Sequence, residues 1–218
     1  MFKLKEAAHL VIVAILFAFV IGIESIVSKD LAAFLVYLLI AFIIIFVSVF
    51  AKKLFAYSRE IEIEQKILHW RRWGWYERSY FKKSLPAGLI LPFVLVWITY
   101  PYYGFIKMLT FLQFDPQPTT ARAAKRHGLY RYSELTEWHI AAIAGIGIFA
   151  SLVLSVFAYI FNFPNLARYS IYYAAWNLLP LGQLDGSKLL FGSRRLWVLL
   201  AILVLIGLFY SLFLGSLM

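Results

Sequence analysis

Five long apolar runs dominate the pattern of this chain. They cover residues 9–27, 31–50, about 140–161, 168–184 and about 196–216. A helix needs about 20 largely apolar residues to cross the hydrocarbon core of a bilayer, and each run approaches or reaches that length. Only residues 28–30 separate the first two runs, so these are expected to form a tight helical hairpin. The pattern predicts five transmembrane helices.

Two polar segments interrupt the apolar runs. Residues 51–83 carry nine lysines and arginines among glutamates and aromatic residues, and residues 113–139 are polar and basic again. Within the first segment, residues 60–64 alternate polar and apolar side chains, which is the period of a half-exposed strand. A small β-rich insertion is therefore expected between the second and third spans.

The apolar segment 85–112 allows two interpretations, because two glycines and three prolines interrupt it. One straight helix tolerates such a density poorly, so the segment is either a kinked span or a re-entrant hairpin. If it re-enters, 18 of the 21 lysines and arginines collect on one side of the membrane. Since cytoplasmic loops are enriched in basic residues, this favours re-entry, with the N-terminus in the cytoplasm.

Composition agrees with a polytopic membrane protein. Hydrophobic residues make up 63% of the 218 residues and charged residues only 15%, which excludes an ordinary soluble domain. The formal charge of +10 is better explained by membrane orientation and anionic headgroups than by nucleic acid, since no recognition motif accompanies it. The aromatic and arginine cluster at 70–76 is likewise read as a membrane-interface belt, so no nucleic-acid partner is expected.

The fourth run ends in a motif with an acidic residue. It contains five residues in the spacing NxxPxxxLDG: Asn177, Pro180, Leu184, Asp185 and Gly186. A carboxylate at the end of a hydrophobic run is costly at membrane depth, so it marks a candidate functional site. This stretch resembles the signature of the site-2 protease family of intramembrane zinc metalloproteases. In that family the Asp is the third zinc ligand and the Asn lies beside the active site.

The resemblance implies an all-α polytopic membrane protein with a site-2 protease-like helical core and about five transmembrane helices. Residues 1–30 would form an accessory first helix and residues 31–218 the core. Within that core the parts would be a cytoplasmic or re-entrant insertion (51–139), the helices that carry a GxxxN-like stretch and the LDG motif (140–188), and the last transmembrane helix (196–218). Ala141 to Gly145 resembles the alanine-rich start of the second core helix. A prokaryotic cytoplasmic membrane is the expected location.

The zinc-binding HExxH motif of that family is absent from the sequence. Counting back from Ala51-Lys52-Lys53, which resembles the basic patch after the motif, the histidine positions hold Ile43 and Val47 and the glutamate position holds Ile44. Alkyl side chains cannot bind zinc, and one carboxylate alone does not hold the ion. No catalytic residue and no cofactor are therefore expected, and Asp185 is interpreted as part of a vestigial site.

An alternative is a relocated metal site with zinc. Asp185 would share it with His139, His9 and Glu6, which the topology places at the same cytoplasmic level. No tight spacing ties these residues together, so they are more simply polar residues at helix ends. Asp185 has a structural interpretation as well, pairing with Lys188 or capping backbone donors, and Asn177 would bond the unwound backbone at Pro180.

Two functions follow. The first is a catalytically inactive site-2 protease-like membrane protein, with membrane lipids and the transmembrane or juxtamembrane segments of other proteins as partners. The second is an active intramembrane metalloprotease that uses the relocated site with Asp185.

Overall fold

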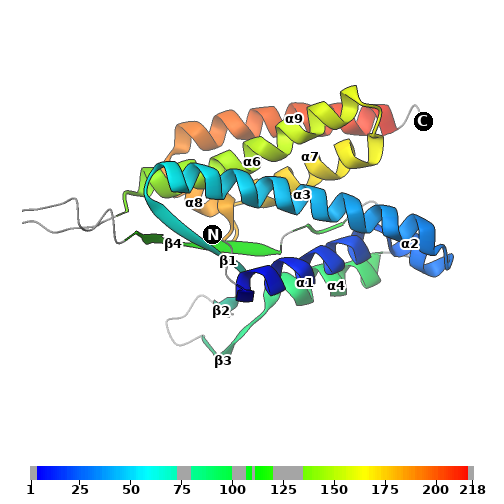
Figure 1. Ribbon diagram of the computed structural model, residues 1–218, viewed down its shortest axis with the longest axis horizontal. Coiled ribbons are helices and arrows are strands. Elements are labelled where there is room, and N and C mark those ends of the chain that lie inside the picture. Colours follow the sequence, from blue (N-terminus) through cyan, green and yellow to red (C-terminus); the bar gives the residue numbers. More distant parts are fainter. Residues whose placement is uncertain (1–3, 73–79, 100–106, 110, 120–134, 216–218) are drawn as a thin grey trace, which may run out of the picture. The chain divides into compact units, whose positions relative to one another are not determined.

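Helices make up most of the part of the chain that the structure describes, which is residues 4–72, 80–99, 107–109, 111–119 and 135–215 of a computed structural model. Figure 1 labels the elements in chain order. The helices are α1 (Leu4–Ile21), α2 (Ile23–Val27), α3 (Leu31–Ser58), α4 (Ala87–Thr99), α6 (Glu137–Ile160), α7 (Pro164–Leu178), α8 (Asp185–Gly192) and α9 (Arg194–Gly215). The strands are β1 (Ile61–Ile67), β2 (Trp70–Arg72), β3 (Tyr80–Leu85) and β4 (Leu112–Pro118).

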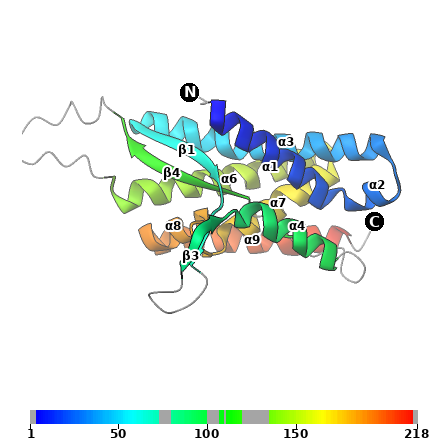
Figure 2. The same ribbon diagram turned by 90° about the horizontal axis from the view of Figure 1, so that it is seen from below.

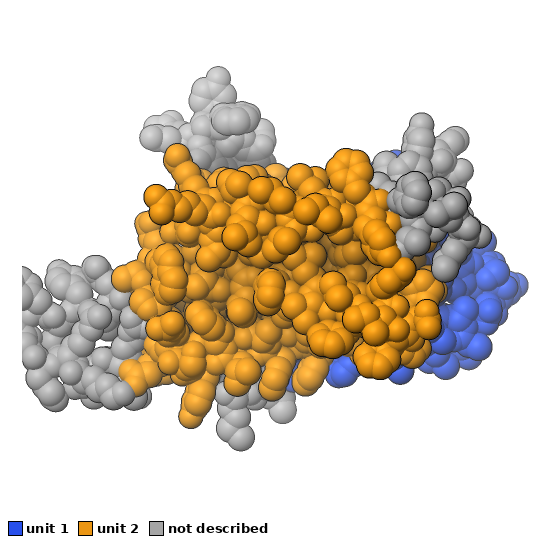
Figure 3. Space-filling view, turned by 90° about the horizontal axis from the view of Figure 1, so that it is seen from above, with its two compact units in different colours: residues 1–42, 66–113 blue, residues 43–65, 114–218 orange. Residues whose placement is uncertain are grey.

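The chain forms two compact units, coloured separately in Figure 3. The first contains residues 1–42 and 66–113, and the second contains residues 43–65 and 114–218. The boundary passes through α3 and through the pair β1 and β4, so the same helix and sheet contribute to both units. Asp185 and the helices of the LDG region belong to the second unit.

Within the described residues, three helices are long and apolar enough to cross a membrane: Leu31–Ser58, Glu137–Ile160 and Arg194–Ser211. They correspond to the second, third and fifth predicted spans. The fourth expected span, 168–184, is different, because α7 ends at Leu178 after 15 residues. Pro180 restricts Leu179 to an extended conformation, with φ −63° and ψ 133°, and so ends the helix. The count of five spans stays a prediction.

The helix of the second predicted span, 31–50, extends into the polar segment 51–83. Helix α3 continues through Lys52 and Lys53 to Ser58. No glycine or proline lies between residues 51 and 58, and lysine is a good helix former, so nothing in this stretch stops the helix. The turn comes at Glu60, which has a positive φ of 56°. Lys52 is consequently a buried helix residue with 2% of its surface exposed.

The predicted strand is confirmed. β1 alternates buried and more exposed residues from Ile61 to Ile67 and pairs with β4, which lies beside it in Figure 2. The amide of Leu68 donates to the carbonyl of Phe111, and the amide of Thr119 donates to that of Glu60, so the two strands run antiparallel. A second antiparallel pair joins β2 to β3.

The two ends of the interrupted apolar segment meet in the first unit. The amide of Gly88 donates to the carbonyl of Leu68, whose own amide donates to Phe111. A side chain at position 88 would strike the Phe111 carbonyl, so glycine is needed for this approach. A segment that crosses a bilayer separates its ends by about 30 Å. Gly88 and Phe111 instead bond to the same residue, Leu68, so these two ends of the segment lie close together.

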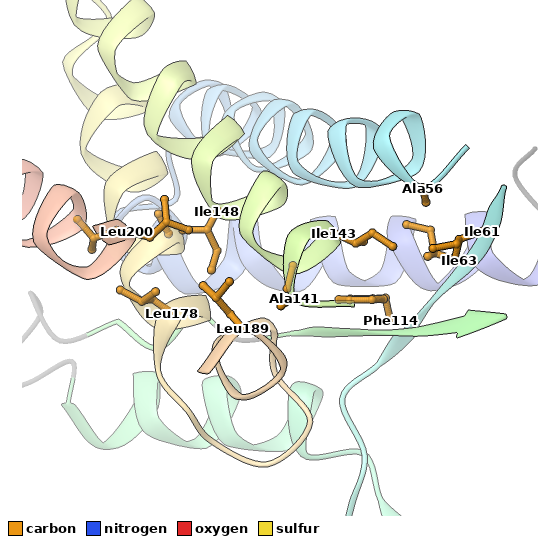
Figure 4. Close-up of a cluster of buried hydrophobic side chains, with 13 residues drawn as sticks. Ala56, Ile61, Ile63, Phe114, Ala141, Ile143, Ile148, Leu178, Leu189 and Leu200 are labelled. Atoms are coloured by element: carbon orange, nitrogen blue, oxygen red, sulfur yellow. The ribbon is translucent and has the colours of Figure 1, made fainter. Parts of the chain in front are cut away.

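A hydrophobic core lies at the centre of the second unit (Figure 4). Helix α6 packs on α7 and α8, and α7 packs on α9. The start of α6 turns small residues inward, among them Ala141, Ala144 and Gly145, and this lets Leu189 of α8 and Leu196 of α9 approach closely. The core holds α8, and therefore Asp185, against α6.

Candidate functional site

Asp185 is the first residue of α8 and is buried, with 1% of its surface exposed. After α7 the chain makes a tight turn in which Gly182 takes a positive φ of 56°. The amide of Leu184 donates to Leu181 at 3.1 Å and closes this turn. Residues 179–183 are exposed, whereas residues 184–187 are buried. The turn thus returns the chain to the interior at the LDG motif.

Lys52 of α3 forms an ion pair with Asp185 through the lysine Nζ and the carboxylate Oδ2. Both side chains are almost completely buried, with 3% and 2% exposed. The second carboxylate oxygen, Oδ1, is buried and accepts no hydrogen bond from the described residues. The pairing that we predicted between Asp185 and Lys188 is wrong. The positive charge comes instead from a helix 133 residues earlier in the chain.

Glycine in α6 makes room for Lys52. A Cβ at Gly147 would collide with the aliphatic stem of Lys52, so the glycine lets α3 lie close to α6. One turn before Lys52, the hydroxyl of Ser48 donates to the Gly147 carbonyl at 3.3 Å. Ile44, Ser48 and Lys52 are spaced by four residues and form one buried face of α3.

Tyr173 and Asn177 of α7 extend this polar cluster. Both are buried, with 2% and 3% exposed. The Tyr173 hydroxyl has the side chains of Ser48 and Asn177 as hydrogen-bonding partners and lies within electrostatic range of Asp185. The Asn177 side-chain amide donates to the Tyr173 carbonyl at 2.9 Å. We had expected Asn177 to bond the unwound backbone at Pro180. Its side chain bonds instead to the backbone of its own helix.

Lys188, one turn after Asp185, has other partners. Its Nζ donates to the carbonyl of Phe114 and lies 3.7 Å from the centroid of the Phe114 ring, a cation–π geometry. Burial lowers the pKa of Lys188 to about 8, against the opposing attraction of Asp185. Repulsion from Lys52 adds to the lowering. The surroundings of Asp185 thus already contain two amines.

Stability should depend on pH through Lys188. The pKa of this amine is 10.5 ordinarily and about 8 in the folded chain, so between these values the unfolded state binds more protons. Stability therefore rises as the pH increases from about 8 to 10.5. We expect the unfolding temperature of wild type in detergent to rise relative to that of Lys188→Met over this range. Parallel curves for the two proteins would contradict this assignment.

The positions that the resemblance assigns to the HExxH motif are apolar and lie on α3. Ile44 is buried, whereas Ile43 and Val47 are partly buried. The residues near Asp185 do not fit a zinc ion, because Lys52 occupies one carboxylate oxygen and two ammonium groups repel a divalent cation. Among the described side chains, no three of the types His, Cys, Asp and Glu lie close enough to hold a metal.

The other candidate residues lie apart in the sequence. His139 is near the start of α6 and shares a hydrogen bond between its Nδ1 and the hydroxyl of Thr136. Glu6 is buried in the first turn of α1, and His9 follows on the same helix, in the first unit. A metal site that joins them to Asp185 stays a prediction. Most of the aromatic cluster lies outside the described residues, which end at 72 and resume at 80.

Sequence reasoning missed four residues of the cluster: Ser48, Lys52, Gly147 and Tyr173. Lys52 was counted with the basic residues of the polar segment 51–83 and with the basic patch that follows the expected motif. One signal was available, since Ser48 and Lys52 are four residues apart in a stretch without helix breakers. A buried carboxylate also requires a partner charge, and Lys52 is the first lysine after the apolar run 31–50.

Comparisons with known proteins leave the chain without an assigned family. No family model matches it, and neither the curated proteins nor the solved structures contain a match.

Proposed function

We propose that the chain is a non-catalytic, site-2 protease-like protein of a prokaryotic cytoplasmic membrane, with a cytoplasmic N-terminus and about five transmembrane helices. In this proposal the core binds transmembrane or juxtamembrane segments of other membrane proteins without cutting them. A helical core of a protease that admitted a substrate helix would retain a surface for one after its catalytic residues were lost.

The ion pair between Lys52 and Asp185 is the observation that carries the proposal. In a zinc protease the Asp at this position binds the metal, and its charge is neutralised by the cation. Here a lysine ammonium neutralises it, from the helix on which the resemblance locates the two histidine ligands. The pair therefore supplies the charge that the carboxylate needs for burial, but it supplies no Lewis acid and no activated water.

One feature favours the second candidate, a metalloprotease with a relocated site. The Oδ1 atom of Asp185 is buried without a hydrogen bond from the described residues, and a metal ion would satisfy it. The two candidates differ in what Asp185 contributes: a metal ligand in one, and a structural anion in the other.

Metal analysis of the purified chain separates the two candidates. We expect no stoichiometric zinc and no chelator-sensitive cleavage of a membrane-spanning reporter, because Lys52 competes for the carboxylate. The matched control is Asp185→Asn, which keeps the shape and removes the charge, and it should give the same result. One zinc per chain, lost in Asp185→Asn together with cleavage, would overturn the non-catalytic proposal.

A further inference from the structure

An apolar groove of about 600 Å³ opens in the second unit between α6, α7 and α9. Its walls come from the C-terminal half of α6, the first turns of α7 and the C-terminal part of α9, which lie at one end of these helices in Figures 1 and 2. Hydrocarbon side chains such as those of Val156, Ile171 and Ile206 form most of the surface of the groove. The groove contains no residue of the Asp185 cluster.

One charged side chain, Arg168 of α7, stands among the described residues that line the groove. Two serines add polarity. The hydroxyl of Ser155 already has a hydrogen-bond partner, since it donates to the Ala167 carbonyl at 2.8 Å. The hydroxyl of Ser211 is buried and has no hydrogen-bond partner among the described residues. The groove thus combines a long apolar surface with a cation and an unsatisfied hydroxyl.

The walls of the groove suit a lipid chain. A hydrocarbon chain has no polar groups that need hydrogen bonds, and the walls of this groove are mostly carbon. An acyl chain therefore matches the surface that the groove offers.

The position of Arg168 suits a lipid headgroup. It lies one turn into α7, just after the connection from α6 in which Phe161 and Phe163 are exposed. Tyr159 and Tyr210 also line the groove and form an edge-on aromatic pair, with their ring centroids 5.3 Å apart. Aromatic rings gather at the membrane interface, and arginine extends its charge toward the phosphates there. We propose that the groove binds one acyl chain of an anionic phospholipid whose phosphate pairs with Arg168.

Native mass spectrometry of the full chain, released from detergent after addition of phosphatidylglycerol or phosphatidylcholine, tests this proposal. Wild type should retain one phosphatidylglycerol and bind phosphatidylcholine more weakly. Removing one basic contact weakens binding to an anionic lipid by about fivefold. Arg168→Gln should therefore lose this preference and bind both lipids alike. The matched control is Arg195→Gln, at the other end of α9, which should behave as wild type.

A second variant tests the groove itself. A Cβ at Gly207 would meet side-chain carbons of Ile171 at 3.5–3.7 Å, so Gly207→Phe directs a ring into the space between α7 and α9. This variant should lose both lipids while it keeps the unfolding temperature of wild type. Equal affinity of wild type for the two lipids, an unchanged preference for phosphatidylglycerol in Arg168→Gln, or binding of either lipid by Gly207→Phe would overturn the proposal. Displacement of the lipid by a transmembrane peptide at equal concentration would overturn it in favour of a protein partner.

Discussion

Replacing Lys52 by methionine is expected to lower the free energy of unfolding by about 3–5 kcal/mol, because it leaves the buried carboxylate of Asp185 without its counter-charge. Methionine keeps most of the length of the lysine stem, so the contact with Gly147 is retained and the change is chiefly one of charge. Reversible unfolding in mixed detergent micelles measures the effect. Water cannot stabilise the unpaired carboxylate, since both side chains of the ion pair are at most 3% exposed.

Two further variants isolate the ion pair. Lys52→Met combined with Asp185→Asn removes both charges and should recover most of the loss, because the cost comes from the unpaired charge rather than from the missing contact. Lys53→Met, at the neighbouring and less buried position of α3, should change the free energy of unfolding by less than about 1 kcal/mol. A double variant as unstable as the single one would disprove the pairing.

This pair gives the vestigial interpretation of Asp185 a physical basis. Loss of metal ligands alone would leave a buried anion, which is strongly destabilising. A lysine on the facing helix removes that cost, so the carboxylate can remain. In the proposed function, the apolar residues Ile43, Ile44 and Val47 and the charged residue Lys52 belong to one change, in which a lysine ammonium replaces the metal as the counter-charge of Asp185.

Much of the fold could be predicted from hydrophobic patterning. Three of the five predicted spans coincide with long apolar helices, and the alternation at residues 60–64 located β1. These signals are local, since each arises within one element of the chain. The interrupted segment 85–112 was recognised as irregular for the same reason, although only the bonds of Gly88 and Phe111 to Leu68 show that its ends meet.

The candidate site was harder to predict, because it depends on contacts between distant residues. Asp185 was identified through its motif, but Lys52 lies 133 residues earlier. Helix α8 was missed because the apolar run 168–184 reads as one span, and nothing before Pro180 shows that the chain turns back. The role of Gly147 cannot be read from sequence, since it depends on which side chain faces it.

Replacing Gly186 by alanine is expected to lower the free energy of unfolding by about 1–3 kcal/mol. The added Cβ would collide with the carbonyl of Leu178 and approach that of Leu179, and backbone atoms cannot rotate away as a side chain can. Unfolding in mixed micelles again provides the measurement. The matched control is Gly207→Ala on α9, where the added Cβ makes only ordinary contacts. Because alanine favours the helix over glycine, this control should raise the free energy of unfolding by about 0.5–1 kcal/mol.

A second readout distinguishes displacement of the site from general instability. Gly186 lets the start of α8 lie against the end of α7, and this contact directs Asp185 toward Lys52. If α8 shifts to relieve the collision, the ion pair opens and the Lys52 amine becomes accessible. We therefore expect faster labelling of Lys52 by an amine-reactive reagent in Gly186→Ala than in Gly207→Ala, under conditions where both remain folded. Equal labelling would show that the glycine of the LDG motif supports the fold without positioning the carboxylate.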